Sequence, residues 1–133
     1  MAMSRRELRE QIFKLLFRVE FNSMEDMAEQ EQLFFEDEEA AKDEDAVYIS
    51  DKYHKISEKL SEIDSQLNEK AQGWHTDRMN KVDLTILRLA VYEICYDEDV
   101  PTGVAINEAV ELAKKFGQDA SFGFVNGVLA KFA

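Results

Sequence analysis

Cysteine and proline each occur once in the 133 residues, and histidine occurs twice. The single thiol, Cys95, has no second cysteine for an intrachain disulfide, and its place on a strongly apolar segment predicts a small buried residue in a reducing compartment. His54 and His75 have neither cysteine partners nor the spacing of a helical metal site. The fold is therefore expected to form without a disulfide and without a metal ion.

Long apolar runs free of charge are also missing. No such run follows Arg5 and Arg6, which argues against a signal peptide or an anchor, and the most apolar stretch is interrupted by Asp83, Arg88 and Glu93. We therefore expect a cytoplasmic protein with no membrane contact. Segments of strand periodicity are absent as well, so the predicted class is all-α.

That most apolar stretch, residues 82–96, predicts a central core helix. Its apolar residues cover most of the helix circumference, so other helices of the same chain must surround it. Arg88 needs carboxylate or carbonyl partners in such surroundings, and Asp83 and Glu93 are the nearest carboxylates in sequence. A content of 45% apolar residues is sufficient for one such core in a single domain.

Helical periodicity recurs on both sides of this stretch, with apolar residues three or four positions apart. Ser4 and Glu7 form a capping-box pattern at the first helix, and Gly117 follows the helix that precedes the last one. The other expected helices are a first over 5–21, a second from 23 through 34, one long or two short helices between 46 and 71, one over 104–116, and a last one capped by Ser121.

Three local features carry expectations of their own. Residues 25–45 hold eleven acids against one lysine, and the part from 36 to 45 is expected to be a solvated connection. Trp74 is expected to fill a gap between helices. Gly123 and Gly127 lie one turn apart on the last helix, where they are expected to permit the close approach of a helix or a ligand.

Charge separates the start of the chain from the rest. The net charge is −12, which disfavours nucleic-acid binding, yet residues 4–21 carry five basic residues against three acids. At 100° per residue Arg6, Arg9, Phe13 and Phe17 share one strip of the first helix. This strip has two interpretations: a surface for single-stranded RNA, or rings that widen the core beside solvated arginines.

Several sequence blocks together resemble the NusB family of transcription antitermination factors. The resemblance covers the first helix and nearly all of residues 73–132. Its blocks are Arg5-Arg6 with Arg9-Glu10 and Leu16-Phe17, then Gly73-Trp74, then 82–93 (VDLTILRLAVYE), 100–114 (VPTGVAINEAVELAK) and 124–129 (FVNGVL). It implies one domain over 1–133 with about seven helices in two small bundles, an N-terminal helical subdomain over 1–71 and a C-terminal one over 72–133.

The resemblance also implies a function. Proteins of this family bind the box A element of ribosomal RNA operon transcripts together with NusE, a small-subunit ribosomal protein, and work with other antitermination factors and RNA polymerase; they are not enzymes and need no cofactor. The implied partner residues on the NusE side are Asp77 and Asp83. With Phe13 added from the strip, the expected RNA-binding residues are Arg5, Arg6, Arg9, Phe13, Phe17, Phe116, Phe122 and Phe124.

Two alternatives belong to other classes of protein. The first is a homodimeric interaction module whose first helix is covered by a second copy, with RNA binding secondary; the sequence leaves monomer and homodimer open. The second is the NusB-like unit that occurs fused to RNA methyltransferases. The chain has neither a glycine-rich cofactor loop nor a catalytic cysteine motif, so we expect no methyltransferase domain in it.

Overall fold

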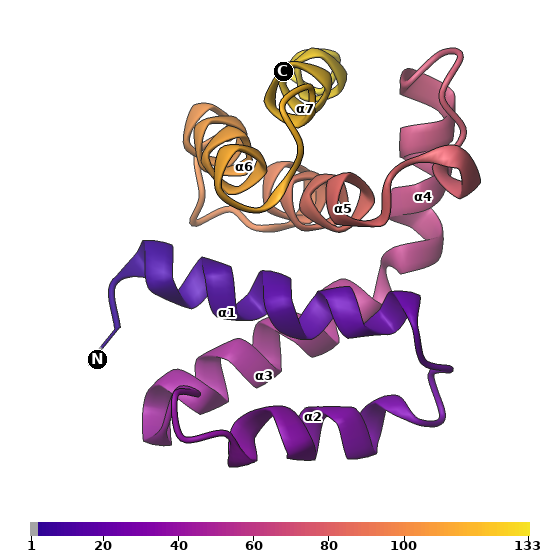
Figure 1. Ribbon diagram of the computed structural model, residues 1–133. Helices are drawn as coiled ribbons and strands as arrows, with labels where there is room; N and C mark the ends of the chain where they lie inside the picture. Colours follow the sequence, from indigo (N-terminus) through magenta and orange to yellow (C-terminus); the bar gives the residue numbers. More distant parts are fainter. Residues whose placement is uncertain (1–2) are drawn as a thin grey trace. The chain divides into compact units, whose positions relative to one another are not determined.

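The computed structural model describes residues 3–133, and within them the secondary structure consists of seven α-helices and two 3-10 helices without any strand (Figure 1). The all-α prediction is confirmed. The chain divides into two compact units, Met1–Ser57 and Glu58–Ala133. Helix α4 therefore clusters with the second unit, although the expected boundary after residue 71 assigns it to the first subdomain.

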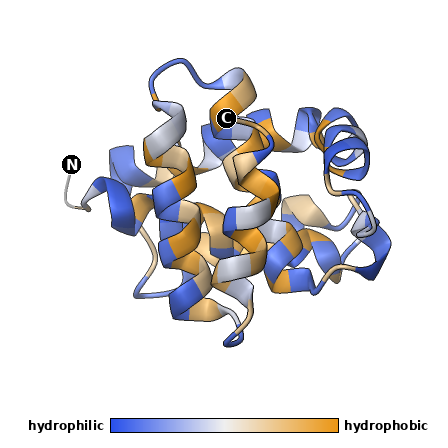
Figure 2. Cartoon of the chain, turned by 90° about the horizontal axis from the view of Figure 1, so that it is seen from above, coloured by the Kyte–Doolittle hydropathy of each residue, from blue (hydrophilic) through white to orange (hydrophobic). Residues whose placement is uncertain are grey.

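The first unit contains α1 (Arg5–Phe17), the 3-10 helix η1 (Arg18–Glu20), α2 (Met27–Glu36) and most of α3 (Asp43–Glu58), and Figure 1 shows α3 crossing beside α1 and α2. Each helix buries the face that its apolar spacing predicts. Along each helix, Figure 2 shows hydrophobic residues alternating with hydrophilic ones. The buried apolar residues of these helices are Leu8, Ile12, Phe13, Leu15 and Leu16 on α1, Met27 and Phe34 on α2, and Ile49, Tyr53 and Ile56 on α3.

The start of α1 has the predicted capping box. The Glu7 backbone N–H donates to Ser4 Oγ at 3.1 Å, and the Ser4 backbone N–H donates to Glu7 Oε1 at 3.1 Å. The Ser4 backbone N–H, and after it the Ser4 hydroxyl, hold the pKa of the Glu7 carboxyl below its ordinary value by hydrogen bonding to it. This box fixes where the basic helix begins.

Replacing Ser4 by alanine is expected to lower the free energy of unfolding by about 1 kcal/mol, because the Glu7 N–H loses its acceptor at the helix start. Circular dichroism during urea unfolding measures the change. Ser65→Ala is the matched control, since Ser65 is an exposed serine inside α4 and away from a helix end. An equal loss in both variants would contradict a specific role of the cap.

The acidic connection departs from its prediction. Ala40, Ala41 and Asp45 are buried, and α3 already begins at Asp43. The Asp45 side chain accepts a hydrogen bond from the Met3 backbone N–H at 3.0 Å, and Lys42 Nζ donates to the Asp37 carbonyl at 2.9 Å. The segment is thus partly a structural element, because two alanines without charge let the chain turn inward between the acids.

The second unit contains α4 (Leu60–Lys70), the 3-10 helix η2 (Thr76–Arg78), α5 (Lys81–Tyr96), α6 (Thr102–Phe116) and α7 (Ser121–Ala130). Helix α5 contacts α4, α6 and α7, and α6 also contacts α7. Residues Leu84 to Glu93 of α5 are buried except for Arg88. The prediction of a central core helix is therefore confirmed for this unit.

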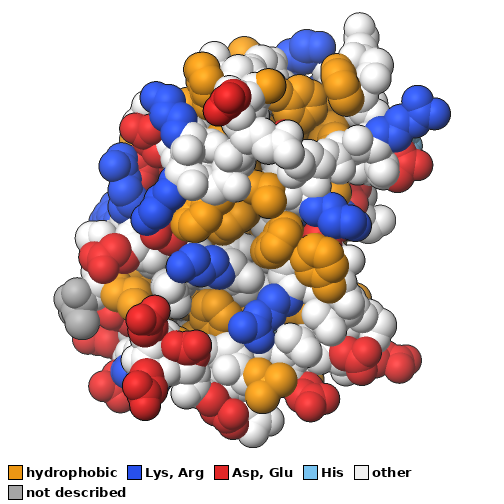
Figure 3. Space-filling view, viewed as in Figure 1, with side chains coloured by type: hydrophobic (Ala, Val, Ile, Leu, Met, Phe, Trp, Pro, Cys, Tyr) orange, Lys and Arg blue, Asp and Glu red, His pale blue; other side chains and the backbone are white. Residues whose placement is uncertain are grey.

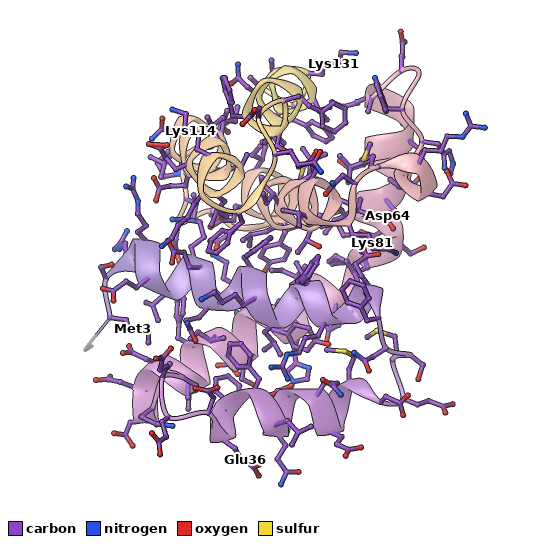
Figure 4. The ribbon with its side chains drawn as sticks, in the orientation of Figure 1. Met3, Glu36, Asp64, Lys81, Lys114 and Lys131 are labelled. Carbon is purple, nitrogen blue, oxygen red and sulfur yellow. The ribbon has the colours of Figure 1, made fainter. Side chains whose placement is uncertain are left out.

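Arg88 takes a different partner from the two that sequence proximity suggested. Its guanidinium forms a two-pronged ion pair with Asp64, with Nε–Oδ1 at 2.9 Å and Nη2–Oδ2 at 2.8 Å. Asp64 lies on α4 (Figure 4). Asp64 precedes Arg88 by 24 residues. The expected carboxylate partner is thus present, but it comes from another helix and not from the nearest acids in sequence, because packing of α4 on α5 supplies a carboxylate with planar two-point geometry.

Three further side chains differ from their predictions. Cys95 is exposed in the last turn of α5, where its Sγ lies 3.5 Å from Gln66 Oε1 of α4. Trp74 is 54% exposed and fills no gap between helices. Ser121 does not cap α7: it is the buried first residue of that helix, and its Oγ accepts from the Gln118 N–H at 2.9 Å.

The glycines of α6 and α7 have two different surroundings. A Cβ on Gly117 would lie 2.6 Å from Ser121 Cβ and 2.7 Å from the Ala113 carbonyl, so the turn between these helices requires a glycine. A Cβ on Gly123 or Gly127 would meet no atom within 4 Å among the described residues. No helix of this part of the chain therefore packs closely against that strip, and the expected approach of a helix is not observed.

Candidate nucleic-acid interface

The N-terminal part of α1 carries three arginines on its accessible side. Arg5 and Arg6 are exposed and Arg9 is half-buried, while the buried face of the helix is turned away from them. Arginine side chains at such positions bind phosphate groups through several N–H donors. The structure therefore presents the three predicted arginines together on one helix.

Two phenylalanine rings continue along the same helix, and a third, Phe21, follows η1. Phe13 and Phe17 stack with ring centroids 6.1 Å apart, and Phe17 meets Phe21 edge-to-face at 5.1 Å. Their exposure rises along the row: Phe13 is buried, Phe17 is half-buried, and Phe21 is 62% exposed. The core interpretation therefore holds for Phe13, whereas Phe17 and Phe21 present ring surface to solvent.

Arg18 belongs to the basic start of the chain but has an internal partner. Its Nη1 donates to the Gln30 carbonyl at 3.0 Å, and its guanidinium lies 5.2 Å from the centre of the Phe34 ring. Both partners are on α2. Arg18 therefore holds η1 against α2.

The three aromatic residues predicted near the end of the chain all lie in the second unit, on α6 and α7. Phe122 is 47% exposed, and Phe116 and Phe124 are half-buried. Lysines accompany two of these rings: Lys114 Nζ lies 5.9 Å from the Phe122 ring centre, and Lys115 Nζ lies 5.4 Å from that of Phe116. A ring beside a cation suits a ligand that has both bases and phosphates.

Two exposed rings were missed by sequence reasoning. Phe21 follows Phe17 by one helical turn, and that i, i+4 spacing was the available signal. Trp74 forms an edge-to-face pair with Phe124, with ring centroids 5.3 Å apart. No spacing in the sequence relates Trp74 to Phe124, because the loop after α4 and helix α7 meet only through the packing of the second unit.

The two acidic residues predicted for a protein partner differ in access. Asp77 is exposed in η2, where its Oδ1 lies 2.8 Å from His75 Nδ1. Asp83 is buried in the first turn of α5, and its Oδ1 has no hydrogen-bond partner among residues 3–133. Asn80 caps this helix by accepting from the Val82 N–H at 2.9 Å. Asp77 is therefore the directly accessible member of the pair.

The described residues contain no group of three or more histidine, cysteine, aspartate or glutamate side chains that could hold a metal ion. No helix over 3–133 is both long and apolar enough to cross a membrane. What this part of the chain does offer is helices with arginine or lysine beside exposed aromatic rings. Fold and surface together define an all-α protein of the nucleic-acid-binding class.

Comparison with known proteins identifies the family. The NusB family model matches residues 6–133. The transcription antitermination protein NusB of Agathobacter rectalis is 54% identical over 131 residues, which cover 98% of this chain and all of the relative. The chain belongs to the NusB family, whose members are transcription antitermination proteins and not enzymes.

Solved structures agree with this assignment. A NusB structure from T. maritima matches with a TM-score of 0.86 at 36% identity and covers 100% of this chain and 92% of that one. A chain in a crystal structure of the antitermination factors NusB and NusE with double-stranded RNA has the same fold, with a TM-score of 0.84 at 24% identity over 99% of this chain and 97% of its own.

Proposed function

We propose that this protein binds the box A element of ribosomal RNA operon transcripts together with NusE, and supports processive transcription as part of a larger complex with RNA polymerase and other antitermination factors in the cytoplasm. The proposed RNA contacts are Arg5, Arg6, Arg9 and Phe17 in the first unit and Phe116, Phe122 and Phe124 in the second. Phe13 is buried and stacks against the Phe17 ring, so it supports Phe17 without itself being accessible.

The observation that carries this proposal is the surface of α1. Its exposed arginines precede a row of rings that opens toward solvent at Phe17 and Phe21. Arginines bind the phosphates of RNA whatever its base sequence, and aromatic rings stack on unpaired bases. The helix therefore offers both kinds of contact that a single strand requires. The match to antitermination proteins over nearly the full chain makes a nascent transcript the appropriate ligand.

A binding titration tests the proposal. Fluorescently labelled box A RNA and a scrambled RNA of the same composition are titrated with the protein, each with and without NusE, and the anisotropy is recorded. We expect box A RNA to bind more tightly than the scrambled strand, and most tightly when NusE is present. Equal affinity for both strands under both conditions would overturn the proposed function.

Asp77→Lys is expected to weaken NusE binding directly, to leave binary RNA binding unchanged or slightly stronger, and to lower RNA affinity only when NusE is present. A lysine on η2 reverses the charge that a basic ribosomal protein would meet. Because NusE and RNA are proposed to bind cooperatively, linkage requires each to tighten the other by the same factor, typically about 5- to 150-fold.

Calorimetry on the two binary pairs and the ternary mixture measures these quantities. Asp51→Lys makes the same charge change at an exposed position of α3 and is the control. Asp77 is preferred over Asp83 because a lysine at the buried Asp83 would damage the start of α5. If Asp77→Lys abolished binary RNA binding, Asp77 would belong to the RNA surface and not to a separate surface for NusE.

One observation favours self-association as a second candidate. Phe21 and Met24 are both more than half exposed directly after α1, and a second copy that covered them would mask the same row of rings. Size-exclusion chromatography with light scattering, with and without box A RNA, distinguishes the two. A dimer that RNA does not dissociate, with no RNA bound, would favour the interaction module over the RNA-binding factor.

A further inference from the structure

An exposed indole in the second unit, Trp74, is not among the proposed RNA contacts but is paired with one of them, Phe124. Trp74 lies in the loop between α4 and η2, and its ring meets Phe124 of α7 edge-to-face. Whether the edge of the indole meets the face of Phe124 or the edge of Phe124 meets the face of the indole, Phe124 leaves at least one indole face uncovered. With 54% of the residue exposed, this face is available to a flat ligand.

Lysines stand on the same side of the second unit. Lys70, at the end of α4, places Nζ 4.8 Å from the centre of the Phe132 ring and 3.3 Å from the Lys131 carbonyl oxygen. Lys131 is itself exposed at the end of α7 (Figure 4). The Lys70 ammonium therefore lies against the C-terminal end of α7, the helix that carries Phe124 about two turns earlier.

The outer face of α7 joins this pair to Phe122. By helical spacing Phe122 and Phe124 lie on opposite edges of that face, with Asn126, Gly127 and Ala130 exposed between them. Figure 3 shows hydrophobic side chains beside lysine and arginine side chains in its upper part, where Figure 1 places α6 and α7. Helix α7 has no charged residue, and nothing on this face repels an anion.

The positive charge of the C-terminal residues favours an anionic ligand for this face. Residues 114–133 contain three lysines and one aspartate, a side-chain charge of +2 in a chain whose net charge is −12. A partner that carries negative charge and flat rings together satisfies both the lysines and the indole. An uncharged protein helix would fill this face but would make no use of the positive side-chain charge of residues 114–133.

We propose that Trp74, paired with Phe124 and accompanied by Lys70 and Lys131 at the C-terminal ends of α4 and α7, is a base-stacking site for single-stranded RNA that extends the ligand's path across the outer face of α7. The inference rests on the proposed function for its ligand and adds a site to it. Trp74 stacks on an unpaired base, and the two lysines contact the flanking phosphates. An aromatic platform of this kind tolerates any base, because each has a π-face.

Trp74 is the sole tryptophan, so its emission reports on this site alone. Titration with single-stranded box A RNA is expected to quench the emission along the same isotherm as the anisotropy of the labelled strand. The same sequence in a perfect duplex is expected to quench little, because its bases are already stacked. Quenching by the duplex equal to that by the single strand would overturn stacking as the mode of contact.

Substitution gives the second measurement. Trp74→Leu is expected to weaken single-stranded RNA binding by about 5- to 150-fold, whereas Trp74→Phe keeps a stacking ring and should remain within a few-fold of the wild type. Tyr48→Leu removes an exposed ring from α3 of the first unit and is the matched control. The affinities are measured by anisotropy with and without NusE, and urea unfolding checks that each variant is folded.

The outcomes separate this inference from the function on which it rests. If the wild type binds box A RNA but Trp74→Leu binds it equally and the emission is unchanged, the stacking site is wrong while the function stands. If Trp74→Leu weakens NusE binding and leaves RNA binding intact, the face is a protein contact and the inference is overturned. If the wild type binds no RNA with or without NusE, both are overturned.

Discussion

Leu87→Ala is expected to lower the free energy of unfolding by about 2 to 5 kcal/mol, a large part of the stability of a small domain. Leu87 is completely buried in the middle of α5, the helix that α4, α6 and α7 all contact. Removing three carbon atoms there loses apolar burial and leaves a cavity that three fixed helices close only partly.

Urea unfolding followed by circular dichroism measures this loss. Leu33→Ala is the matched control, because Leu33 on α2 is 47% exposed and its truncation should change the free energy of unfolding by less than about 0.5 kcal/mol. A loss of less than about 1 kcal/mol in Leu87→Ala would contradict the central position of α5 in the second unit.

The double variant Arg6→Ala/Arg9→Ala is expected to show the largest loss of RNA affinity among changes to α1. Each lost phosphate contact removes about 0.7 from the slope of log K against log salt concentration for a single strand, so the slope should fall by about 1.4. The helix should stay folded, because Arg6 and Arg9 lie outside its fully buried apolar face.

Anisotropy titrations of box A RNA over a range of salt concentrations give the slope directly. Lys55→Ala/Lys59→Ala removes the same charge near the end of α3 and serves as control, since a general field effect would change both variants alike. An unchanged slope in the arginine variant, with its circular dichroism intact, would remove α1 from the RNA surface.

The sequence predicts the helices well where a helix end has its own chemical signal. The capping box at Ser4 and the stop at Gly117 place the start of α1 and the end of α6 at their observed positions. For residues 46–71 the sequence leaves one long helix or two short ones open, and the structure has two helices that break at Lys59. Local chemistry determines ends, because caps act within a few residues.

The failures share one cause. Periodicity predicts which side of a helix is buried but not how far its neighbours extend along it, so Cys95 in the last turn of α5 was wrongly expected to be buried. It also gives no information on partners from other helices, as with Asp64 for Arg88. Trp74 was assigned to the core by its size alone, whereas a loop position leaves it exposed beside Phe124.

The candidate site could be predicted only in part for the same reason. The positions of Arg5, Arg6 and Arg9 could be predicted because all three lie on one helix with 100° between successive residues, and α1 presents them outside its buried face. Phe13 and Phe17 share that strip but differ in exposure, which depends on what packs beside each ring. The pairing of Trp74 with Phe124 needs two segments fifty residues apart in sequence, and only the folded unit brings them together.

The break at Lys59 and the Arg88–Asp64 pair have a consequence for how the chain opens in solution. Helix α4 follows α3 directly in sequence, yet Ile63 and Leu67 are fully buried and Asp64 is bound by α5. Its amide protons should therefore exchange with deuterium together with those of α5 and not with those of α3, because opening α4 must break the ion pair and expose both side chains. Two helices that follow one another in sequence and meet at Lys59 are therefore expected to belong to different cooperative opening units.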